Sequence, residues 1–136
     1  MKKHILFLLL FFSLHLVYGQ TKFNHILITN DDGKEDSDRL LALAMSVKDV
    51  ANRVSIIVSD FDRSGTSNRT AYGKYQSTFE VTCTYVDKEN NITGYTIPDY
   101  PADCVALGLS GFFGENRPDL VLSGINGGAN IGSSWF

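Results

Sequence analysis

The sequence predicts an α/β fold with a doubly wound, mostly parallel sheet. Three short segments, residues 26–29, 54–58 and 120–123, are largely apolar, and each runs into polar residues or glycine. Strands of this kind are typical of parallel sheets that are buried on both faces, whereas half-exposed strands alternate apolar and polar residues. Between the first two segments the apolar residues repeat at helical spacing, so strand, helix and strand are predicted to form a βαβ unit.

The first 19 residues are predicted to be a secretory signal peptide, and residues 20–136 the folded domain. A basic start is followed by an almost entirely apolar run over residues 5–17. Residues 17–19 then offer side chains that are small or that a signal peptidase can accept at a cleavage point. A membrane anchor would need about 20 apolar residues, and this run is shorter and contains Ser13 and His15. We therefore expect a periplasmic or secreted protein without stable membrane anchoring.

Within the domain, a helix is predicted to begin at Ser37, which can cap it, and to continue through Val47. Residues 77–86 alternate between apolar and polar side chains, which predicts a half-exposed strand. A turn at 88–91 leads into a second strand that ends near Ile97. Together these two strands are predicted to form a hairpin inserted beside the main sheet.

The last predicted helix starts at Pro101, which suits a first helical turn, and carries apolar residues as far as Leu109. Glycines and Pro118 then break the chain before the final strand, residues 120–123.

Composition limits the classes of partner. The 136 residues are 43% hydrophobic and 20% charged, which suits one globular domain with a buried core. The net charge of -3 gives no electrostatic footprint for a nucleic acid polymer, so any nucleotide partner is expected to be small. The spacing of Cys83 and Cys104 resembles neither a zinc site nor a redox pair, and both are interpreted as small apolar core residues.

The predicted strands end in polar loops that should meet at one edge of the sheet, where open α/β sheets bind ligands. Asp31 and Asp32 follow the first strand, and adjacent carboxylates usually persist where a cation neutralises them. The other two loops offer hydroxyl and amide oxygens, those of Ser64, Ser67, Asn68, Ser123 and Asn126. Oxygen donors suit Mg²⁺, Mn²⁺ or Ca²⁺ better than zinc.

The same loops are rich in glycine, whose backbone N–H groups can bind an anion. These glycines are Gly65, Gly124, Gly127 and Gly128, and Arg63 or Arg69 can add a positive charge. A cation beside an anion cradle indicates phosphate ester chemistry. Taken singly, each of these residues is also common in ordinary turns.

Four longer motifs stand in a fixed order along the chain. They are Ile-Leu-Ile-Thr-Asn-Asp-Asp-Gly at 26–33, Asp-Arg-Ser-Gly-Thr-Ser-Asn at 62–68, Pro-Ala-Asp-Cys-Val at 101–105 and Pro-Asp-Leu-Val-Leu-Ser-Gly-Ile-Asn-Gly-Gly-Ala-Asn-Ile-Gly at 118–132. In these motifs, and over nearly the whole predicted domain, the chain resembles the SurE family of survival-protein nucleotidases. The resemblance implies a Rossmann-like, metal-dependent phosphatase that acts on nucleoside monophosphates with Mg²⁺ or Mn²⁺.

The resemblance also implies roles for individual residues. The metal ligands fall on Asp31, Asp32, Ser64 and Asn126. Asp31 and Asp32 form the catalytic pair, in which Asp31 either orients or activates the attacking water or contacts the phosphoryl group. Positions that contact the phosphate or support the ligands fall on Asn30, Ser123, Gly124 and Asn130.

The chain departs from the family pattern in two places. After Asp-Asp-Gly the family usually has Ala-Pro-Gly, where this chain has residues 34–39, and Ser59 stands where proline is common. Family members also continue beyond the last motif into a further phosphate-site segment and an oligomerising hairpin. We therefore expect residues 20–136 to be the amino-terminal part of a longer, homo-oligomeric protein.

Two other functions compete with a nucleotidase. One is a metal- or nucleotide-binding module without turnover, because the rest of the site lies outside this sequence. The other is a dinucleotide-binding oxidoreductase, which is disfavoured because no G-x-G-x-x-G follows the first strand.

Overall fold

The computed structural model describes residues 22–71, 78 and 80–127, so the predicted signal peptide and Asn130 lie outside it. The strands are β1 (Phe23–Thr29), β2 (Ala51–Ser59), β3 (Thr82–Asp87), β4 (Ile92–Ile97) and β5 (Leu120–Ser123). The helices are α2 (Ser37–Val47) and α3 (Pro101–Leu109), with 3₁₀ helices η1 (Gly33–Asp36) and η2 (Lys48–Val50) before and after α2. Among the described residues, no helix is long and apolar enough to cross a bilayer.

The strands form one mostly parallel sheet in the order β3-β4-β2-β1-β5. β1 pairs in parallel with both β2 and β5, and Ile28 lies opposite Ile56 on one side and Leu122 on the other. β2 also pairs in parallel with β4, while β3 runs antiparallel to β4 at the edge. The predicted fold class is confirmed.

The predicted hairpin exists, but it is part of the main sheet instead of lying beside it. Its second strand, β4, is a parallel neighbour of β2, and Ile92 and Ile97 at its two ends are fully buried. β3 begins at Thr82 and is mostly exposed instead of half-buried, and Cys83, expected in the core, is exposed as well. A register shift between Cys83 and Tyr85 interrupts the predicted alternation.

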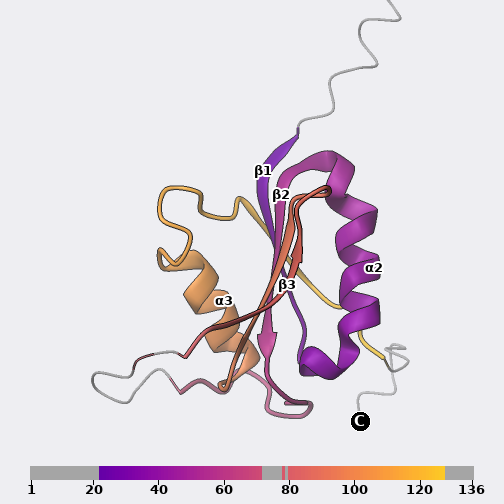
Figure 1. Ribbon diagram of the computed structural model, residues 1–136. Coiled ribbons are helices and arrows are strands. Elements are labelled where there is room, and N and C mark those ends of the chain that lie inside the picture. The colour runs from indigo at the N-terminus through magenta and orange to yellow at the C-terminus, as the bar shows by residue number, and fades with distance from the viewer. Residues whose placement is uncertain (1–21, 72–77, 79, 128–136) are drawn as a thin grey trace, which may run out of the picture.

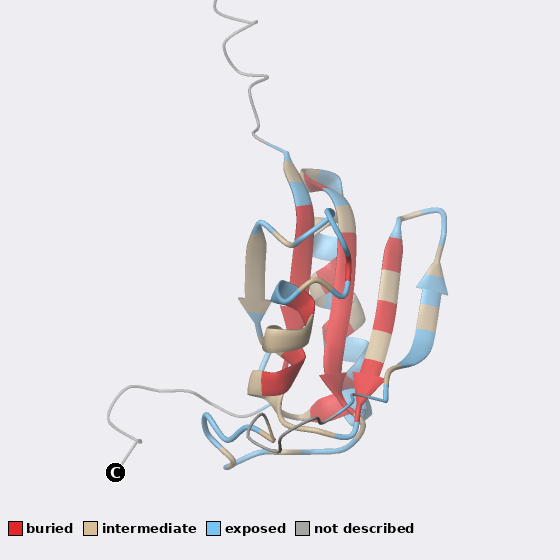
Figure 2. Ribbon diagram, turned by 90° about the vertical axis from the view of Figure 1, so that its left-hand side faces the viewer, coloured by how far each residue is buried: buried red, intermediate tan, exposed pale blue. Residues whose placement is uncertain are grey.

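Helices cover both faces of the sheet, with α2 on one side and α3 on the other (Figure 1). Ile26 and Ile28 of β1 pack in the cluster that includes Leu40 and Ala44 of α2. Leu27, between them, packs on the opposite face with Cys104 of α3. Burial on both faces explains the continuous apolar strands, and the buried residues concentrate in the central strands (Figure 2).

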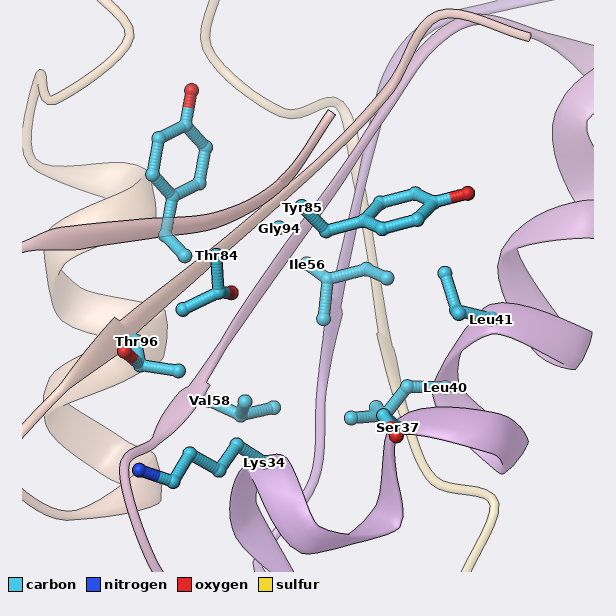
Figure 3. Close-up of a pocket in the computed structure, with 11 residues that line it drawn as sticks. Lys34, Ser37, Leu40, Leu41, Ile56, Val58, Thr84, Tyr85, Gly94 and Thr96 are labelled. Carbon is cyan, nitrogen blue, oxygen red and sulfur yellow. The ribbon is translucent and has the colours of Figure 1, made fainter. Parts of the chain in front are cut away.

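The α2 face of the sheet is covered only in part. A groove of about 390 Å³ lies between α2 and the strands β2, β4 and β3 (Figure 3). Apolar side chains such as Leu40 and Ile56 line it, and Lys34 lies at one end.

Candidate metal centre

Three loops are tied together by backbone hydrogen bonds at the carboxyl ends of the strands. The N–H of Gly124, after β5, donates to the carbonyl oxygen of Thr29 at the end of β1 (3.0 Å). The N–H of Arg63, in the loop after β2, donates to the carbonyl oxygen of Asp31 (2.8 Å). The segment after β1 therefore lies between the other two loops, as the parallel topology predicts.

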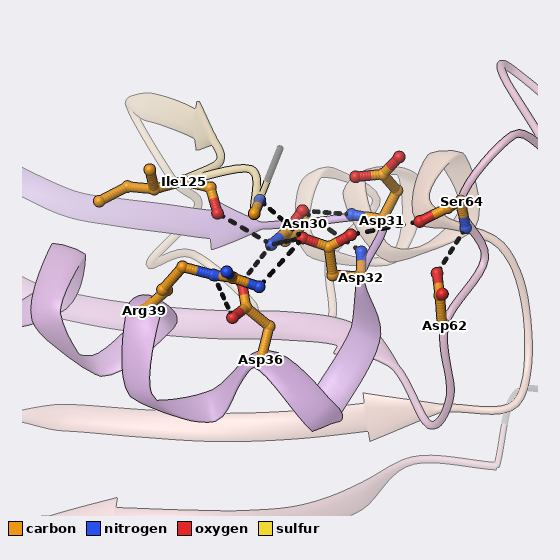
Figure 4. A network of polar contacts seen from close by, with 9 residues as sticks. Asn30, Asp31, Asp32, Asp36, Arg39, Asp62, Ser64 and Ile125 are labelled. Atoms are coloured by element: carbon orange, nitrogen blue, oxygen red, sulfur yellow. Dashed lines mark hydrogen bonds and ion pairs between the residues drawn. The ribbon is translucent and has the colours of Figure 1, made fainter. Parts of the chain in front are cut away.

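Asn30 organises this segment from a position that is only 2% exposed. Its Oδ1 accepts hydrogen bonds from the N–H groups of Asp31 (2.7 Å) and Asp32 (3.3 Å). Its Nδ2 donates to Asp36 Oδ2 (2.8 Å), to Asp32 Oδ2 (3.3 Å) and to the carbonyl oxygen of Ile125 (3.3 Å) (Figure 4). Protein groups thus occupy the whole amide, so Asn30 supports the carboxylate pair and is not available for direct contact with a phosphate.

The two adjacent carboxylates lie in different surroundings. Asp32 Oδ1 accepts a hydrogen bond from Ser64 Oγ (3.2 Å), and its Oδ2 accepts one from the N–H of Gly127 (3.3 Å). Among the described residues, the carboxylate of Asp31 has no hydrogen bond or ion pair, and Asp31 lines a cavity next to the loop after β5. Asp31 is therefore free to bind a ligand, whereas Asp32 is already oriented.

The loop after β2 brings Ser64 to this pair. The N–H of Ser64 donates to Asp62 Oδ1 (2.7 Å), which fixes the turn (Figure 4). Hydrogen bonds from Ser64 hold the pKa of the exposed Asp62 carboxyl below its ordinary value. The loop that carries Ser64 therefore contains a further carboxylate, that of Asp62.

Gly33 allows the first two loops to approach each other. It has a φ of +71°, and a Cβ at this position would lie 2.5 Å from the carbonyl oxygen of Phe61. Only glycine combines this backbone conformation with so close a contact. The Asp-Asp-Gly motif therefore ends in glycine for a tertiary reason as well as a local one.

The cavity beside Asp31 has a volume of about 560 Å³. It is lined by Asn30, Asp31, Leu43, Leu122, Ser123, Gly124, Ile125 and Asn126. The structure thus places the predicted residues Ser123, Gly124 and Asn126 with Asp31, while Asp32 and Ser64 lie on the side toward the loop after β2. The predicted phosphate contact Asn130 lies outside the described residues.

The predicted anion cradle differs from what the structure shows. The N–H groups of Gly124 and Gly127 donate to Thr29 and Asp32, so neither is free for an anion. Sequence patterns could not reveal this, because both acceptors belong to the distant segment around β1. Gly128 lies outside the described residues.

Arg63 was predicted as a possible positive charge for the anion cradle, but its guanidinium contacts neighbouring loop residues instead. Its guanidinium lies 3.6 Å from the ring centre of Phe61 and 4.7 Å from that of Tyr100, and its Nη2 donates to the carbonyl oxygen of Pro98 (2.7 Å). Arg69 also lies over the Tyr100 ring, at 5.4 Å. Stacking on aromatic rings and hydrogen bonding to a carbonyl are typical of a positioning arginine.

Among the described residues, Arg39 forms an ion pair with the carboxylate pair, and no sequence pattern used above indicated it. Its Nη2 lies 3.6 Å from Asp32 Oδ2, and its Nε is bonded to the buried carboxylate of Asp36. The hydrogen bond to Asp36 raises the pKa of this guanidinium above its ordinary value. The spacing of Asp36 and Arg39, three residues apart at the start of a helix, was the available clue.

The donors at this edge fit a hard cation. Within residues 22–71, 78 and 80–127, no three His, Cys, Asp or Glu side chains are grouped to hold a metal ion. What Asp31, Asp32, Ser64 and Asn126 offer is oxygen alone. Mg²⁺ commonly binds through one or two carboxylates and keeps water and substrate phosphate as its other ligands. The residues present fit an ion of that kind, with room for further ligands in the cavity.

Fold and site together define a doubly wound α/β domain with an oxygen-donor site at the carboxyl edge of its sheet. Residues 26–136 match the family model described as "Survival protein SurE", so the chain belongs to the SurE family.

Similar proteins carry the name "5'-nucleotidase SurE". The chain is 39% identical over 111 residues to the one from Alkalilimnicola ehrlichii, covering 79% of this chain and 37% of that protein. It is 36% identical over 115 residues to the one from Chlorobium phaeobacteroides, covering 85% and 42%. For Vibrio vulnificus the identity is 38% over 113 residues, covering 83% and 40%. The chain thus spans about two fifths of the length of these relatives.

Proposed function

We propose that the protein is a divalent-metal-dependent phosphomonoesterase that hydrolyses nucleoside monophosphates, as a 5'- or 3'-nucleotidase using Mg²⁺ or Mn²⁺. One observation carries this proposal. The carboxylate of Asp31, without a partner among the described residues, lies next to the oriented Asp32 and at the wall of a cavity of about 560 Å³. The names of the similar proteins support the choice of substrate class.

Asp31, Asp32, Ser64 and Asn126 are the residues that would hold the ion. A bound divalent ion polarises a phosphoryl oxygen and lowers the pKa of a coordinated water. Asp31 has an uncommitted carboxylate, so it can also accept a hydrogen bond from the attacking water and orient it. Asn30 keeps the two carboxylates in place through the hydrogen bonds to their N–H groups.

The cavity provides the place for the substrate. Its volume lies within the range of about 300–1,000 Å³ that is usual for small-molecule sites. Ser123 is exposed at its wall, and its hydroxyl can donate to a phosphate oxygen. Asn130 remains a proposed phosphate contact. A nucleoside monophosphate, or another small phosphomonoester, matches a site of this size better than a nucleic acid polymer does.

We also propose that residues 1–19 are a signal peptide, which would direct this activity to the periplasm or outside the cell. We further propose that the full-length protein is a homo-oligomer that is not stably anchored to a membrane. The molecular mass of the exported protein in solution tests the oligomeric state, and its recovery in the soluble or the membrane fraction tests the anchoring.

The activity is tested by phosphate release from 5'- and 3'-nucleoside monophosphates by the intact protein, with Mn²⁺, with Mg²⁺ and with a chelator. We expect release with either ion, none with the chelator, and loss of release in Asp31→Asn. The matched control is Asp49→Asn, because Asp49 is 85% exposed in η2, before the first residue of β2. Undiminished release in Asp31→Asn would refute the assigned site.

The alternative is a module that binds a metal ion or a nucleotide without turnover. Calorimetry with Mn²⁺, run beside the release assay, separates the two functions. Binding of Mn²⁺ without release of phosphate from any of the nucleotides would favour the module.

A further inference from the structure

Arg39 bridges two carboxylates beside the proposed metal site. Its Nε is bonded to Asp36 Oδ1, and its Nη2 lies 3.6 Å from Asp32 Oδ2 (Figure 4). Asp36 is only 7% exposed and also accepts the hydrogen bond from Asn30 Nδ2 (2.8 Å). The guanidinium is therefore anchored on a buried, hydrogen-bonded carboxylate.

The two oxygens of Asp32 are divided between separate sets of donors. Oδ2 faces Asn30 Nδ2 (3.3 Å), the N–H of Gly127 (3.3 Å) and the Arg39 guanidinium. Oδ1 faces the hydroxyl of Ser64 (3.2 Å), on the opposite side of the carboxylate. Because three donors surround Oδ2, the oxygen left for a cation is Oδ1.

The absence of a side chain at Gly127 leaves room for the same guanidinium. A Cβ at this position would lie 2.6 Å from Arg39 Nη1 and 2.7 Å from Nη2. The Arg39 head group therefore packs directly on the backbone of the loop after β5. One side chain thus contacts the segment after β1, the start of α2 and the loop after β5.

We propose that Arg39 is a positioning residue, which holds Asp32 Oδ2 so that Oδ1 faces Ser64 and binds the divalent ion as a single-oxygen ligand. This inference rests on the proposed function, because it assigns a role at the same site. This role requires a side chain with several N–H donors in a fixed arrangement, because the guanidinium must contact Asp36 and Asp32 at the same time. Lysine, with one ammonium group on a flexible stem, does not reproduce such a fork.

The test uses two variants of the intact protein. Removing Arg39 alone would leave Asp36 as a buried, uncompensated charge, which is destabilising. The first variant therefore combines Asp36→Asn with Arg39→Met, which removes the bridge and keeps the net charge. The second, Arg39→Lys, keeps the charge and removes the fork. Lys34→Met is the control for losing a nearby positive charge without losing the bridge, because Lys34 lies in the same segment but lines the separate groove against β4 (Figure 3).

The first readout is the affinity for Mn²⁺, from the electron paramagnetic resonance signal of the free ion, which needs no turnover. Loss of a residue that orients a metal ligand typically costs about 10- to 100-fold in affinity or activity. We expect Mn²⁺ binding about 10-fold weaker in both variants and nearly unchanged in Lys34→Met. At saturating Mn²⁺, kcat for phosphate release should fall while the KM for the nucleotide changes little.

The outcomes distinguish this inference from the proposed function. If the wild-type protein binds Mn²⁺ and releases phosphate but both variants match it, the role of Arg39 is overturned and the function stands. Full recovery in Arg39→Lys would mean that charge and not the bridge is required, which also overturns the role. If the wild-type protein neither binds Mn²⁺ nor releases phosphate, the proposed function fails and the role of Arg39 fails with it. Thermal unfolding of each variant establishes that it is folded.

Discussion

Replacing Gly33 with alanine tests how tightly the first two loops of the site are joined. Gly33 is buried and has a φ of +71°, and a Cβ there would lie 2.5 Å from the Phe61 carbonyl oxygen and 3.1 Å from the Asp62 nitrogen. Both contacts are with backbone, so the segment that carries Ser64 must move. Gly65 is the matched control, because it has a similar φ of +76° with no atom within 4 Å of a Cβ.

The expected losses of stability follow from these two environments. The left-handed conformation costs alanine about 1–2 kcal/mol, and the lower entropy of the unfolded chain returns about 0.4–1 kcal/mol. Gly65→Ala should therefore lose about 1 kcal/mol. Gly33→Ala carries the same cost and an overpacking cost of about 1–3 kcal/mol, which gives about 2–4 kcal/mol in total.

Urea unfolding of the two variants and the wild-type protein gives the free energies directly. Mn²⁺ affinity is measured on the same samples, and it should fall in Gly33→Ala alone, because only that variant displaces Ser64. Equal losses of stability in the two variants would refute the reasoning, since the close contact with Phe61 would then contribute nothing.

Two further predictions concern buried titratable groups. Burial lowers the pKa of His25 below its ordinary value of 6.5, and its ring bonds to the Asn116 carbonyl and Ser55 Oγ. Below pH 6.5 the His25 ring therefore binds a proton more readily in the unfolded chain than in the folded one. The free energy of unfolding should fall there as the pH drops, by up to about 1.4 kcal/mol per pH unit. When the free energy of unfolding is measured with urea between pH 5 and pH 8, it should change less with pH in His25→Gln than in the wild-type protein. An equal change with pH in the two proteins would contradict this assignment. Burial raises the pKa of Cys104 to about 12, whereas Cys83 is exposed. Iodoacetamide should therefore label Cys83 and spare Cys104 until the protein is unfolded, as peptide mass spectrometry can measure; equal labelling in the native protein would contradict it.

The fold was largely predictable from the sequence because its strands are buried on both faces. Ile26, Leu27 and Ile28 are consecutive and all fully buried, and they pack on α2 and α3 in turn. Such runs are distinctive in a sequence. The position of β4 was not predictable, because a short hairpin does not indicate which other strand its second strand will join.

The site was predictable at the level of its loops and not of its hydrogen bonds. Strand-end reasoning and the family motifs placed Asp31, Asp32 and Ser64 in one region, and the structure brings them together. The roles of Arg39 and of the glycine N–H groups depend on partners far away in the sequence, such as Gly127 with Asp32. Side-chain direction decides those contacts, and a residue pattern does not encode it.

The contacts of Asp32 also show why the short Asp-Asp-Gly motif can mark a site in this chain. Asp32 contacts Asn30, Ser64 and Gly127, which belong to three different segments of the chain. An Asp-Asp-Gly turn by itself is common. The turn becomes a candidate metal site only because the neighbouring loops supply oxygen donors and hold one carboxylate in place.

The most direct test of the central claim is the anomalous diffraction of Mn²⁺ in crystals of the intact protein. We predict one strong peak within about 2.5 Å of carboxylate oxygens of both Asp31 and Asp32. The peak should lie on the Oδ1 side of Asp32, toward Ser64, and should be absent from crystals of Asp31→Asn. A protein that binds Mn²⁺ only elsewhere, or that keeps the peak in Asp31→Asn, would contradict the assignment of this edge of the sheet as the metal centre.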